Sequence, residues 1–327
     1  MDARPQKHTR NSRWSRDPVS GPDGAPLVVY PTERDIEIFK LLLRFRFLAS
    51  DYIHAFVGGS HKALVHRLNL LSRKPNLYLS RPSQQRQCAD ANYRPLIYEL
   101  DAAALRALRD REIPCPPKAS RHNFQHELMI AQITASIELG ARGNPGIRLI
   151  DWEEILANEN TPETTRSSST PHSIPVSYSL RGVERSDHII PDAQPFGLER
   201  TIDGQRSYLF CPGIEADCGT EPIDAGDPDR SAIVKKFAAY LAIAEQGIHR
   251  SHFGLPNFFV PFITTGAARM ESMLKAVDRL TAGRGSKLLL FKAVPSFTSR
   301  EGPPPPTGHM LTEPWCRARF PPLCFVR

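Results

Sequence analysis

The chain has 327 residues, of which 40% are hydrophobic and 24% are charged. These proportions are typical of a globular protein long enough for two domains. The net charge of +7 favours polyanionic partners. No run of about 18 apolar residues is present, so we expect a cytoplasmic protein with no membrane partner. The six cysteines form no CxxC pair, which argues against a zinc site or a disulfide framework.

Residues 1–29 are rich in arginine, glycine and proline and contain few large apolar residues. Such a composition cannot bury enough apolar surface to offset the entropy lost on ordering. We expect a disordered basic arm, which either contacts phosphates or is a solvated tail.

Residues 30–112 have the pattern of a winged-helix domain. Thr32 can cap a first helix, a second helix fits 49–56, and Ser60 can cap a third. The stretches 77–81 and 95–100 read as two strands that flank a polar loop, the wing. Three short helices followed by two strands are typical of a winged helix-turn-helix, in which the third helix is the recognition helix.

Charge segregation in this region predicts binding to double-stranded DNA. No acidic residue lies between Tyr52 and Ala89, although many basic ones do. The alternative is a small helical domain with a charged surface. The predicted DNA contacts avoid the apolar face of the third helix or lie on the wing: His61, Lys62, His66, Arg67, Asn69, Arg73, Lys74 and Arg81.

A proline-rich hinge at 113–120 separates this domain from a second one at 120–296. The second domain alternates strands and helices, which predicts a three-layer α/β core. Within it, the Ser/Thr/Pro-rich stretch 158–179 is expected to be a flexible insertion, and the proline-rich end at 297–327 a disordered tail.

Acidic residues in the second domain form a candidate metal site. Glu215 and Asp217 share one face of a predicted strand, because successive side chains of a strand alternate. Asp192 follows a short apolar run and joins them if the two strands pair. Converging carboxylates suit Mg²⁺, which prefers oxygen ligands. Lys236 flanks the apolar stripe of the next helix and is the candidate basic residue.

Glu127 lies on a long predicted helix, at 122–142, that has apolar residues on two sides. A carboxylate between two buried faces needs a partner or an ion. It is therefore a fourth candidate metal ligand.

Several stretches together resemble the replication-relaxation family, whose members belong to bacterial plasmids and integrative elements. The resemblance covers about residues 31–295 and implies a setting in mobile-element DNA handling. The motifs are TERDIEIF, IYELDAAALRAL, PDA at 191–193, EADCGTE at 215–221, KFAAY at 236–240 and VPFITTGAAR at 260–269.

The second domain also resembles, more distantly, the PD-(D/E)xK nucleases, which have a restriction-endonuclease-like α/β fold with a mixed sheet. This resemblance implies that Glu127, Asp192 and Glu215 are the acids of the motif. Asp217 is a departure, because the motif has lysine there and a positive charge stabilises the charge that develops on phosphate. Lys236 can supply that charge from the neighbouring helix. The implied catalytic set is Asp192, Glu215, Asp217 and Lys236, with Glu127 as a further Mg²⁺ ligand.

Three functions remain open. The first is a DNA-binding protein of a plasmid or integrative element, acting in replication, DNA relaxation or transfer, or its control, with a nuclease-like second domain. The second is an active Mg²⁺-dependent endonuclease or nickase. The third is a transcriptional regulator on an inactive nuclease fold, which needs no metal. A relaxase is disfavoured, because the sequence contains no closely spaced His-x-His motif. Other replication or transfer proteins and a second copy of the chain are the further candidate partners.

Overall fold

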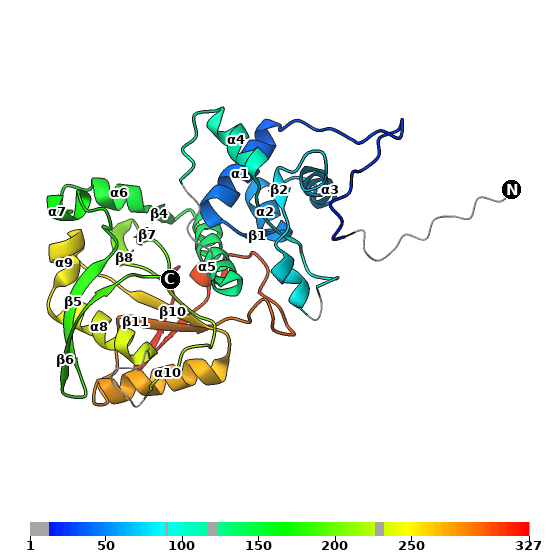
Figure 1. The fold of residues 1–327 in the computed structure, drawn as a ribbon. Helices are drawn as coiled ribbons and strands as arrows, with labels where there is room; N and C mark the ends of the chain where they lie inside the picture. Colours follow the sequence, from blue (N-terminus) through cyan, green and yellow to red (C-terminus); the bar gives the residue numbers. More distant parts are fainter. Residues whose placement is uncertain (1–12, 89–90, 117–122, 226–231, 327) are drawn as a thin grey trace. The chain divides into compact units, whose positions relative to one another are not determined.

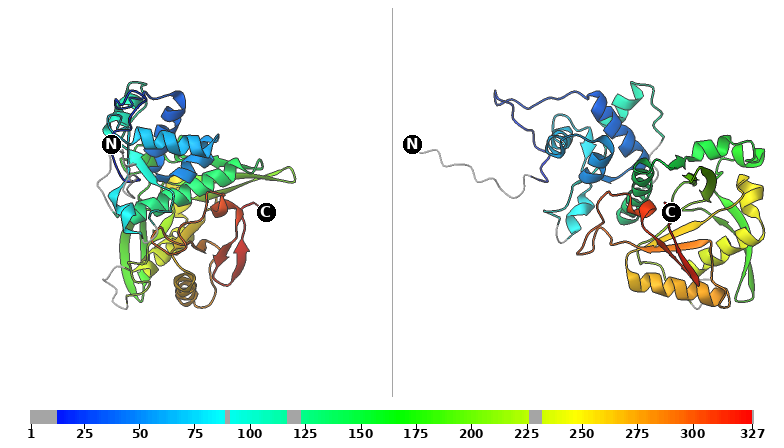
Figure 2. Two further views of the ribbon diagram at one scale, coloured as in Figure 1. Left: turned by 90° about the vertical axis from the view of Figure 1, so that its right-hand side faces the viewer. Right: turned by 180° about the vertical axis from the view of Figure 1, so that it is seen from behind.

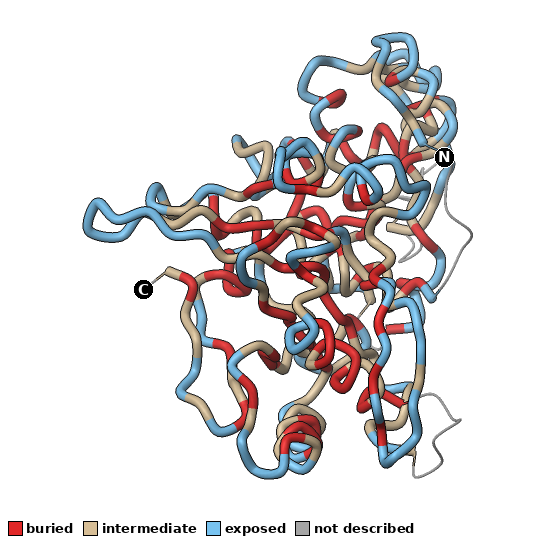
Figure 3. Tube along the Cα trace, turned by 90° about the vertical axis from the view of Figure 1, so that its left-hand side faces the viewer, coloured by how far each residue is buried: buried red, intermediate tan, exposed pale blue. Residues whose placement is uncertain are grey.

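The computed structural model describes residues 13–88, 91–116, 123–225 and 232–326. The chain is mixed α/β and divides into two compact units (Figure 1). Unit 1 contains residues 1–132 and 298–306, and unit 2 contains residues 133–297 and 307–327. Buried segments, red in Figure 3, gather inside the fold, whereas loops are mostly exposed. Within the described ranges, no helix has both the length and the apolar content needed to cross a bilayer.

Unit 1 is a small helical unit closed by a three-stranded antiparallel sheet. Strands β1 and β2 both pair with β3, so the order across the sheet is β1-β3-β2. In chain order the elements are α1 (Glu33–Phe45), β1 (Leu48–Ala49), α2 (Ser50–Val57), α3 (His61–Leu71), β2 (Leu79–Ser80), a 3₁₀ helix (Ser83–Gln87), β3 (Ile97–Leu100), α4 (Ala102–Arg109) and the start of α5 (Phe124–Arg142).

Local sequence signals determine where these helices begin. Thr32 and Asp35 form a reciprocal capping box at the start of α1, which satisfies two backbone donors that lack helical partners. Ser60 accepts the Ala63 amide at the start of α3. Helix α3 then buries Leu64 and Leu68 in the unit and leaves its other side accessible.

The N-terminal segment differs from the disordered arm expected for residues 1–29. Residues 1–12 lie outside the described ranges, but residues from 13 on pack against unit 1. Asn76 is buried and bonds Val29 N at 2.9 Å and Leu27 O at 3.1 Å. Arg81 donates to the carbonyl groups of Arg13 and Ser15. Composition alone could not reveal these partners, because they come from residues distant in the sequence.

Unit 2 is built on a five-stranded mixed sheet with the order β13-β12-β11-β10-β9. Strands β9, β10 and β11 are parallel, and the connections between them carry α8 and α10. Phe237 of α8 packs edge-on against Phe262 of β10 at 4.8 Å between ring centroids. The bounds are β9 (Glu215–Asp217), α8 (Ile233–Glu245), α9 (Ile248–Phe253), β10 (Val260–Thr264), α10 (Ala267–Leu280) and β11 (Leu289–Ala293).

Two smaller antiparallel sheets complete unit 2. One has the order β4-β7-β8, and the other is the hairpin β5-β6, whose strand β5 packs against α8. Their elements are β4 (Ile147–Ile150), α6 (Trp152–Ala157), α7 (Glu163–Arg166), β5 (Ile174–Leu180), β6 (Val183–Ile189), β7 (Phe196–Ile202) and β8 (Gln205–Cys211).

The stretch 158–179 is ordered structure and not the flexible insertion that was expected. It contains α7 and most of β5, and the hydroxyl group of Thr161 bonds the carbonyl groups of Ile155 at 2.7 Å and Phe253 at 3.0 Å. In β5, buried and exposed residues alternate strictly. The Ser/Thr content concealed this alternation because the serines occupy the exposed positions.

The prediction of a disordered tail at 297–327 is also wrong. The segment forms α11 (His309–Thr312), β12 (Trp315–Arg317) and β13 (Phe320–Leu323), and β12 pairs with β11. Figure 2 shows the two strands as a red hairpin beside the orange strands of the sheet. Trp315 is fully buried and donates its indole N–H to Met310 O at 2.8 Å. The prolines signalled disorder, but Trp315 supplies enough buried surface to order the segment.

Replacing Trp315 by alanine tests whether this segment belongs to the core. We expect Trp315→Ala to lower the free energy of unfolding of unit 2 by about 3–5 kcal/mol, because it leaves a large cavity. Calorimetry measures the change, and the transition of unit 1 serves as an internal reference. Tyr93→Ala is the control: Tyr93 is 88% exposed, so its loss should change stability by less than about 0.5 kcal/mol. Equal transitions for both variants would contradict the assignment.

Candidate functional site

Glu215 is the centre of the acidic site in unit 2. It opens β9 and is only 2% exposed. Lys236 Nζ donates to one carboxylate oxygen, and the Tyr240 hydroxyl group donates to the other at 2.6 Å. Lys236 and Tyr240 are four residues apart on α8, so they lie on the same face of the helix. Both oxygens of Glu215 are therefore occupied.

The electrostatics of this group follow from burial and from one neighbouring charge. Burial raises the pKa of Glu215 to about 7, and the nearby charge of Asp192 adds to the rise, although the bonds from Lys236 and Tyr240 oppose it. Burial disfavours the ammonium form of Lys236, but attraction by Glu215 and Asp192 outweighs it, so the pKa of Lys236 is raised. Burial also raises the pKa of Tyr240, which remains a hydrogen-bond donor.

Asp217 lies at the end of β9 and is held by a different set of partners. The Arg269 guanidinium group of α10 contacts both carboxylate oxygens, with Nη2 at 2.9 Å from Oδ1. The Thr264 hydroxyl group donates to Oδ2 at 2.7 Å. Bidentate pairing of this kind is strong and directional. Asp217 therefore connects β9 to β10 and α10.

Asp192 reaches β9 from a loop and not from a paired strand. The expected pairing of its strand with that of Glu215 does not occur, because β6 pairs with β5. Instead, the Asp192 backbone N–H donates to Ile214 O at 3.0 Å, and its Oδ2 accepts the Ala216 N–H at 2.8 Å. Gly213 permits this approach, since a Cβ there would lie 1.9 Å from Pro191.

In this arrangement the acids predicted to bind Mg²⁺ already have partners within the protein. The oxygens of Glu215 and Asp217 are taken by cations and hydroxyl groups, and Asp192 Oδ2 is taken by a backbone amide. Across the described residues, no three His, Cys, Asp or Glu side chains are placed to hold a metal ion. Glu127, the fourth predicted ligand, belongs to unit 1 and forms an ion pair with Arg46 at 3.2 Å.

The predicted DNA-contacting residues divide into exposed and internal ones. His61, Lys62 and His66 are exposed on α3, and Lys74 is exposed after it. Arg67 instead donates to the buried carboxylate of Asp35, with Nη2 at 2.7 Å from Oδ2.

Three further predicted contacts also have internal partners. The Asn69 side chain accepts a bond from Arg73 Nε at 3.0 Å. Arg81 holds the N-terminal segment through its two backbone acceptors, and burial lowers its pKa. The exposed basic side chains are therefore the ones best placed to meet a ligand.

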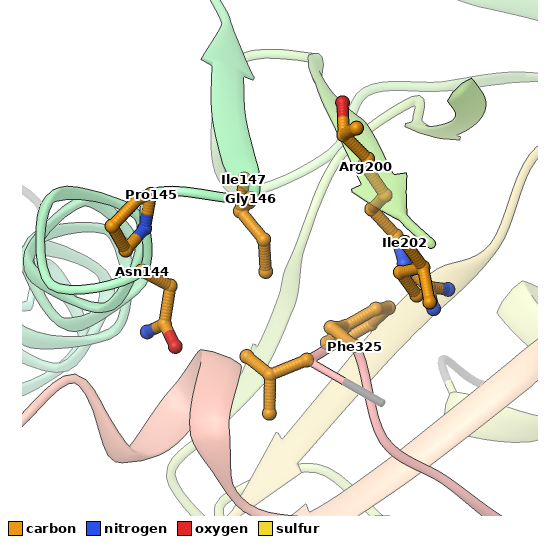
Figure 4. A pocket seen from close by; sticks show the side chains of 9 residues that line it. Asn144, Pro145, Gly146, Ile147, Arg200, Ile202 and Phe325 are labelled. Atoms are coloured by element: carbon orange, nitrogen blue, oxygen red, sulfur yellow. The ribbon is translucent and has the colours of Figure 1, made fainter. Parts of the chain in front are cut away.

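A cavity of about 110 Å³ lies elsewhere in unit 2. Its lining includes Asn144, Ile147, Arg200, Ile202 and Phe325 (Figure 4). It contains none of the predicted catalytic or metal-binding residues.

Comparison with known families gives a match over much of the chain. The model of the family described as Replication-relaxation matches residues 39–257, about two thirds of the chain. The chain belongs to the replication-relaxation family. The matched range includes α3 and the acidic site around Glu215. Neither the curated proteins nor the solved structures provided a match.

The partners that close the acidic site were not predicted from the sequence. Tyr240 and Arg269 were noted only as parts of the family motifs KFAAY and VPFITTGAAR. The spacing of Tyr240 and Lys236, four residues apart on one helix, was a usable signal. No local signal pointed to Arg269, because its contact with Asp217 spans 52 residues.

The raised pKa of Glu215 predicts a specific pH dependence. A carboxyl group whose pKa is higher in the folded state than in the unfolded state stabilises the fold below its unfolded value, here 4.5, and loses this contribution as the pH rises through 7. Between pH 4.5 and 8, wild-type unit 2 should lose about 3 kcal/mol relative to Glu215→Gln. His249 and His252, whose pKa values burial lowers, act in the opposite direction in both proteins and cancel in the comparison. Parallel stability curves in chemical denaturation would contradict the assignment.

Arg67 and Lys62 allow a structural role to be separated from a binding role. Arg67→Ala should destabilise unit 1 by about 2–3 kcal/mol, because it leaves the Asp35 carboxylate, 2% exposed, without its cation. The value lies below the usual cost of breaking a buried pair because Arg67 is itself 27% exposed. Lys62→Ala should change stability by less than about 0.5 kcal/mol. Thermal unfolding measures both, and equal effects would refute the distinction.

Proposed function

We propose that this protein binds double-stranded DNA in a plasmid or integrative mobile element, where it acts in replication, DNA relaxation or transfer, or their control. The observation that carries the proposal is the arrangement of unit 1. Its order α1-β1-α2-α3-β2-β3, with β3 between β1 and β2, supports a winged helix-turn-helix. In that fold α3 enters the major groove.

The accessible side of α3 suits a DNA ligand. His61, Lys62 and His66 are exposed there, and the leucine side is buried. No acidic residue lies between positions 52 and 89 to repel phosphates. In this proposal Lys62 and Lys74 contact the backbone, and the two histidines reach base edges.

The segment between β2 and β3 is the proposed wing. Arg86 is exposed there, and its guanidinium group lies 5.3 Å from the centroid of the Trp14 ring. The indole N–H of Trp14 donates to Asn92 at 3.3 Å. The N-terminal segment thus contributes an aromatic residue and further positive charge beside the wing, which supports a second contact with the DNA backbone.

The positions of the acids in unit 2 support a nuclease-like scaffold that serves DNA binding or the organisation of the protein. Asp192 precedes the hairpin β7-β8 and Glu215 follows it. The two ends of the hairpin lie close together, and Asp192 accepts the backbone N–H of Ala216, the residue after Glu215. This is the order of acids in the PD-(D/E)xK fold. Lys236 and Tyr240 occupy the oxygens that a metal would need, which favours DNA binding over cleavage. The Mg²⁺-dependent endonuclease is the alternative, and a transcriptional regulator on an inactive nuclease fold fits the same arrangement.

DNA affinity measured against salt tests the proposal. Fluorescence anisotropy with labelled duplex should show binding that weakens steeply as salt rises. Lys62→Ala and Lys74→Ala should each weaken binding several-fold and reduce the salt slope by about 1. Lys275→Ala is the matched control, since Lys275 is 65% exposed on α10 of unit 2. Unchanged binding in both unit 1 variants would refute the role of α3.

Supercoiled plasmid incubated with Mg²⁺ or Mn²⁺ separates binding from cleavage. The proposal expects intact plasmid at protein concentrations that saturate binding. Nicking that requires metal and is lost in both Asp192→Ala and Lys236→Ala would favour the endonuclease and refute an internal role for these residues.

A further inference from the structure

The hairpin β5-β6 has one strand edge that the rest of the described chain leaves uncovered. Strand β6 pairs with β5 alone among the described residues (Figure 1). Five of its seven residues are exposed. The strand contains no proline and no lysine, two residues that commonly protect an edge from pairing, and its charged residues are of both signs: Glu184, Arg185 and Asp187. Such an edge presents unpaired N–H and C=O groups to another strand.

The outer edges of β5 and β8 each have hydrogen-bond partners within the described residues. Gln246 donates to Ser177 O of β5 at 2.6 Å, and Pro175 removes a donor from the same strand. In β8, Asn257 donates to Tyr208 O at 2.9 Å and the Phe259 amide donates to Phe210 O at 2.8 Å. The uncovered edge of β6 therefore contrasts with those of β5 and β8.

The turn of the hairpin determines which β6 groups point outward. Arg181 and Gly182 have φ of 57° and 77°, and Leu180 faces Val183, so the connection is a two-residue type I′ turn. In such a turn the closing pair is hydrogen-bonded. Val183 and every second residue after it therefore direct their backbone groups toward β5. Glu184, Ser186 and His188 direct theirs outward.

The sequence of β6 is complementary to itself in antiparallel orientation. If Ser186 faces Ser186 of a second copy, Arg185 faces Asp187, and Glu184 faces His188. Val183, 41% exposed, then faces Ile189. In this register Glu184, Ser186 and His188 of one copy face the same three residues of the other copy. Their outward N–H and C=O groups can therefore form a continuous ladder of hydrogen bonds between the copies. Each charged or apolar pair occurs twice because the contact is isologous.

Neighbouring registers are unfavourable. In an antiparallel pair, two residues that face each other must either both direct their backbone groups toward the partner strand or both direct them away from it. The two-fold axis of the β6–β6 pair can therefore lie only at a residue, and a neighbouring register moves it from Ser186 to another residue of the strand. Centring on Arg185 places arginine against arginine, and centring on Asp187 places aspartate against aspartate. Like charges directly opposite each other destabilise a sheet. Of these central registers, only the Ser186-centred one is free of repulsion.

We propose that β6 forms a homodimer interface, in which two copies join edge to edge into a four-stranded antiparallel sheet, β5-β6 with β6-β5 of the second copy. Backbone hydrogen bonds provide the pairing, and the two Arg185–Asp187 pairs select the partner and the register. The contact is independent of DNA binding and of the acidic site. A dimeric protein binds DNA that carries two half-sites related by two-fold symmetry.

Charge exchange on β6 tests the proposal in the full-length chain. Sedimentation equilibrium should show a monomer–dimer equilibrium for the wild type. Arg185→Asp and Asp187→Arg should each weaken dimerisation at least about tenfold, because they place like charges opposite each other in two pairs. The double variant R185D/D187R restores opposite charges in the same register and should recover the dimer.

Recovery in the double variant cannot arise from misfolding of the single variants, and circular dichroism checks the fold of each. Arg250→Asp is the matched control: it makes the same charge change at an exposed position of α9 and should leave the dimer intact. Three results would overturn the proposal. They are a monomeric wild type at 100-fold the concentration used for DNA binding, single variants that dimerise as the wild type does, and a double variant that stays monomeric.

Discussion

The buried carboxylate of Glu215 is the constraint on which the organisation of unit 2 depends. A charge 2% exposed in an apolar core is tolerated only with compensating partners, and α8 supplies them as Lys236 and Tyr240. These bonds fix α8 against β9, and Asp217 and Arg269 fix α10 against the same strand. The central parallel strands are thus joined to both helices by charged contacts as well as by packing.

The two units differ in whether their charged side chains are paired internally or exposed. Unit 2 directs its acids and cations toward each other, whereas unit 1 leaves His61, Lys62 and His66 exposed. Membership in the replication-relaxation family fits a protein that handles the DNA of a mobile element. In the proposed function, α3 contacts DNA and the acid cluster has a structural role.

Local signals predicted much of the fold but not the partners of charged side chains. The caps at Thr32 and Ser60 and the periodicity of α8 depend on neighbouring residues, so they could be read from the sequence. The phase of α8 also placed Lys236 correctly beside the apolar stripe. The ordered N-terminal and C-terminal segments were missed because their order comes from distant contacts, such as those of Asn76 and Trp315. The partner of Glu127 was equally inaccessible, because tertiary packing determines it.

Hydrogen–deuterium exchange with and without duplex DNA and Mg²⁺ tests the central claim most directly. The account predicts slower exchange in α3 and in the segment between β2 and β3 when DNA is added. It predicts no metal-dependent change at Asp192 or in β9. Protection of Asp192 and β9 that requires both DNA and Mg²⁺, with no change in α3, would contradict the account and place the functional site at the acids.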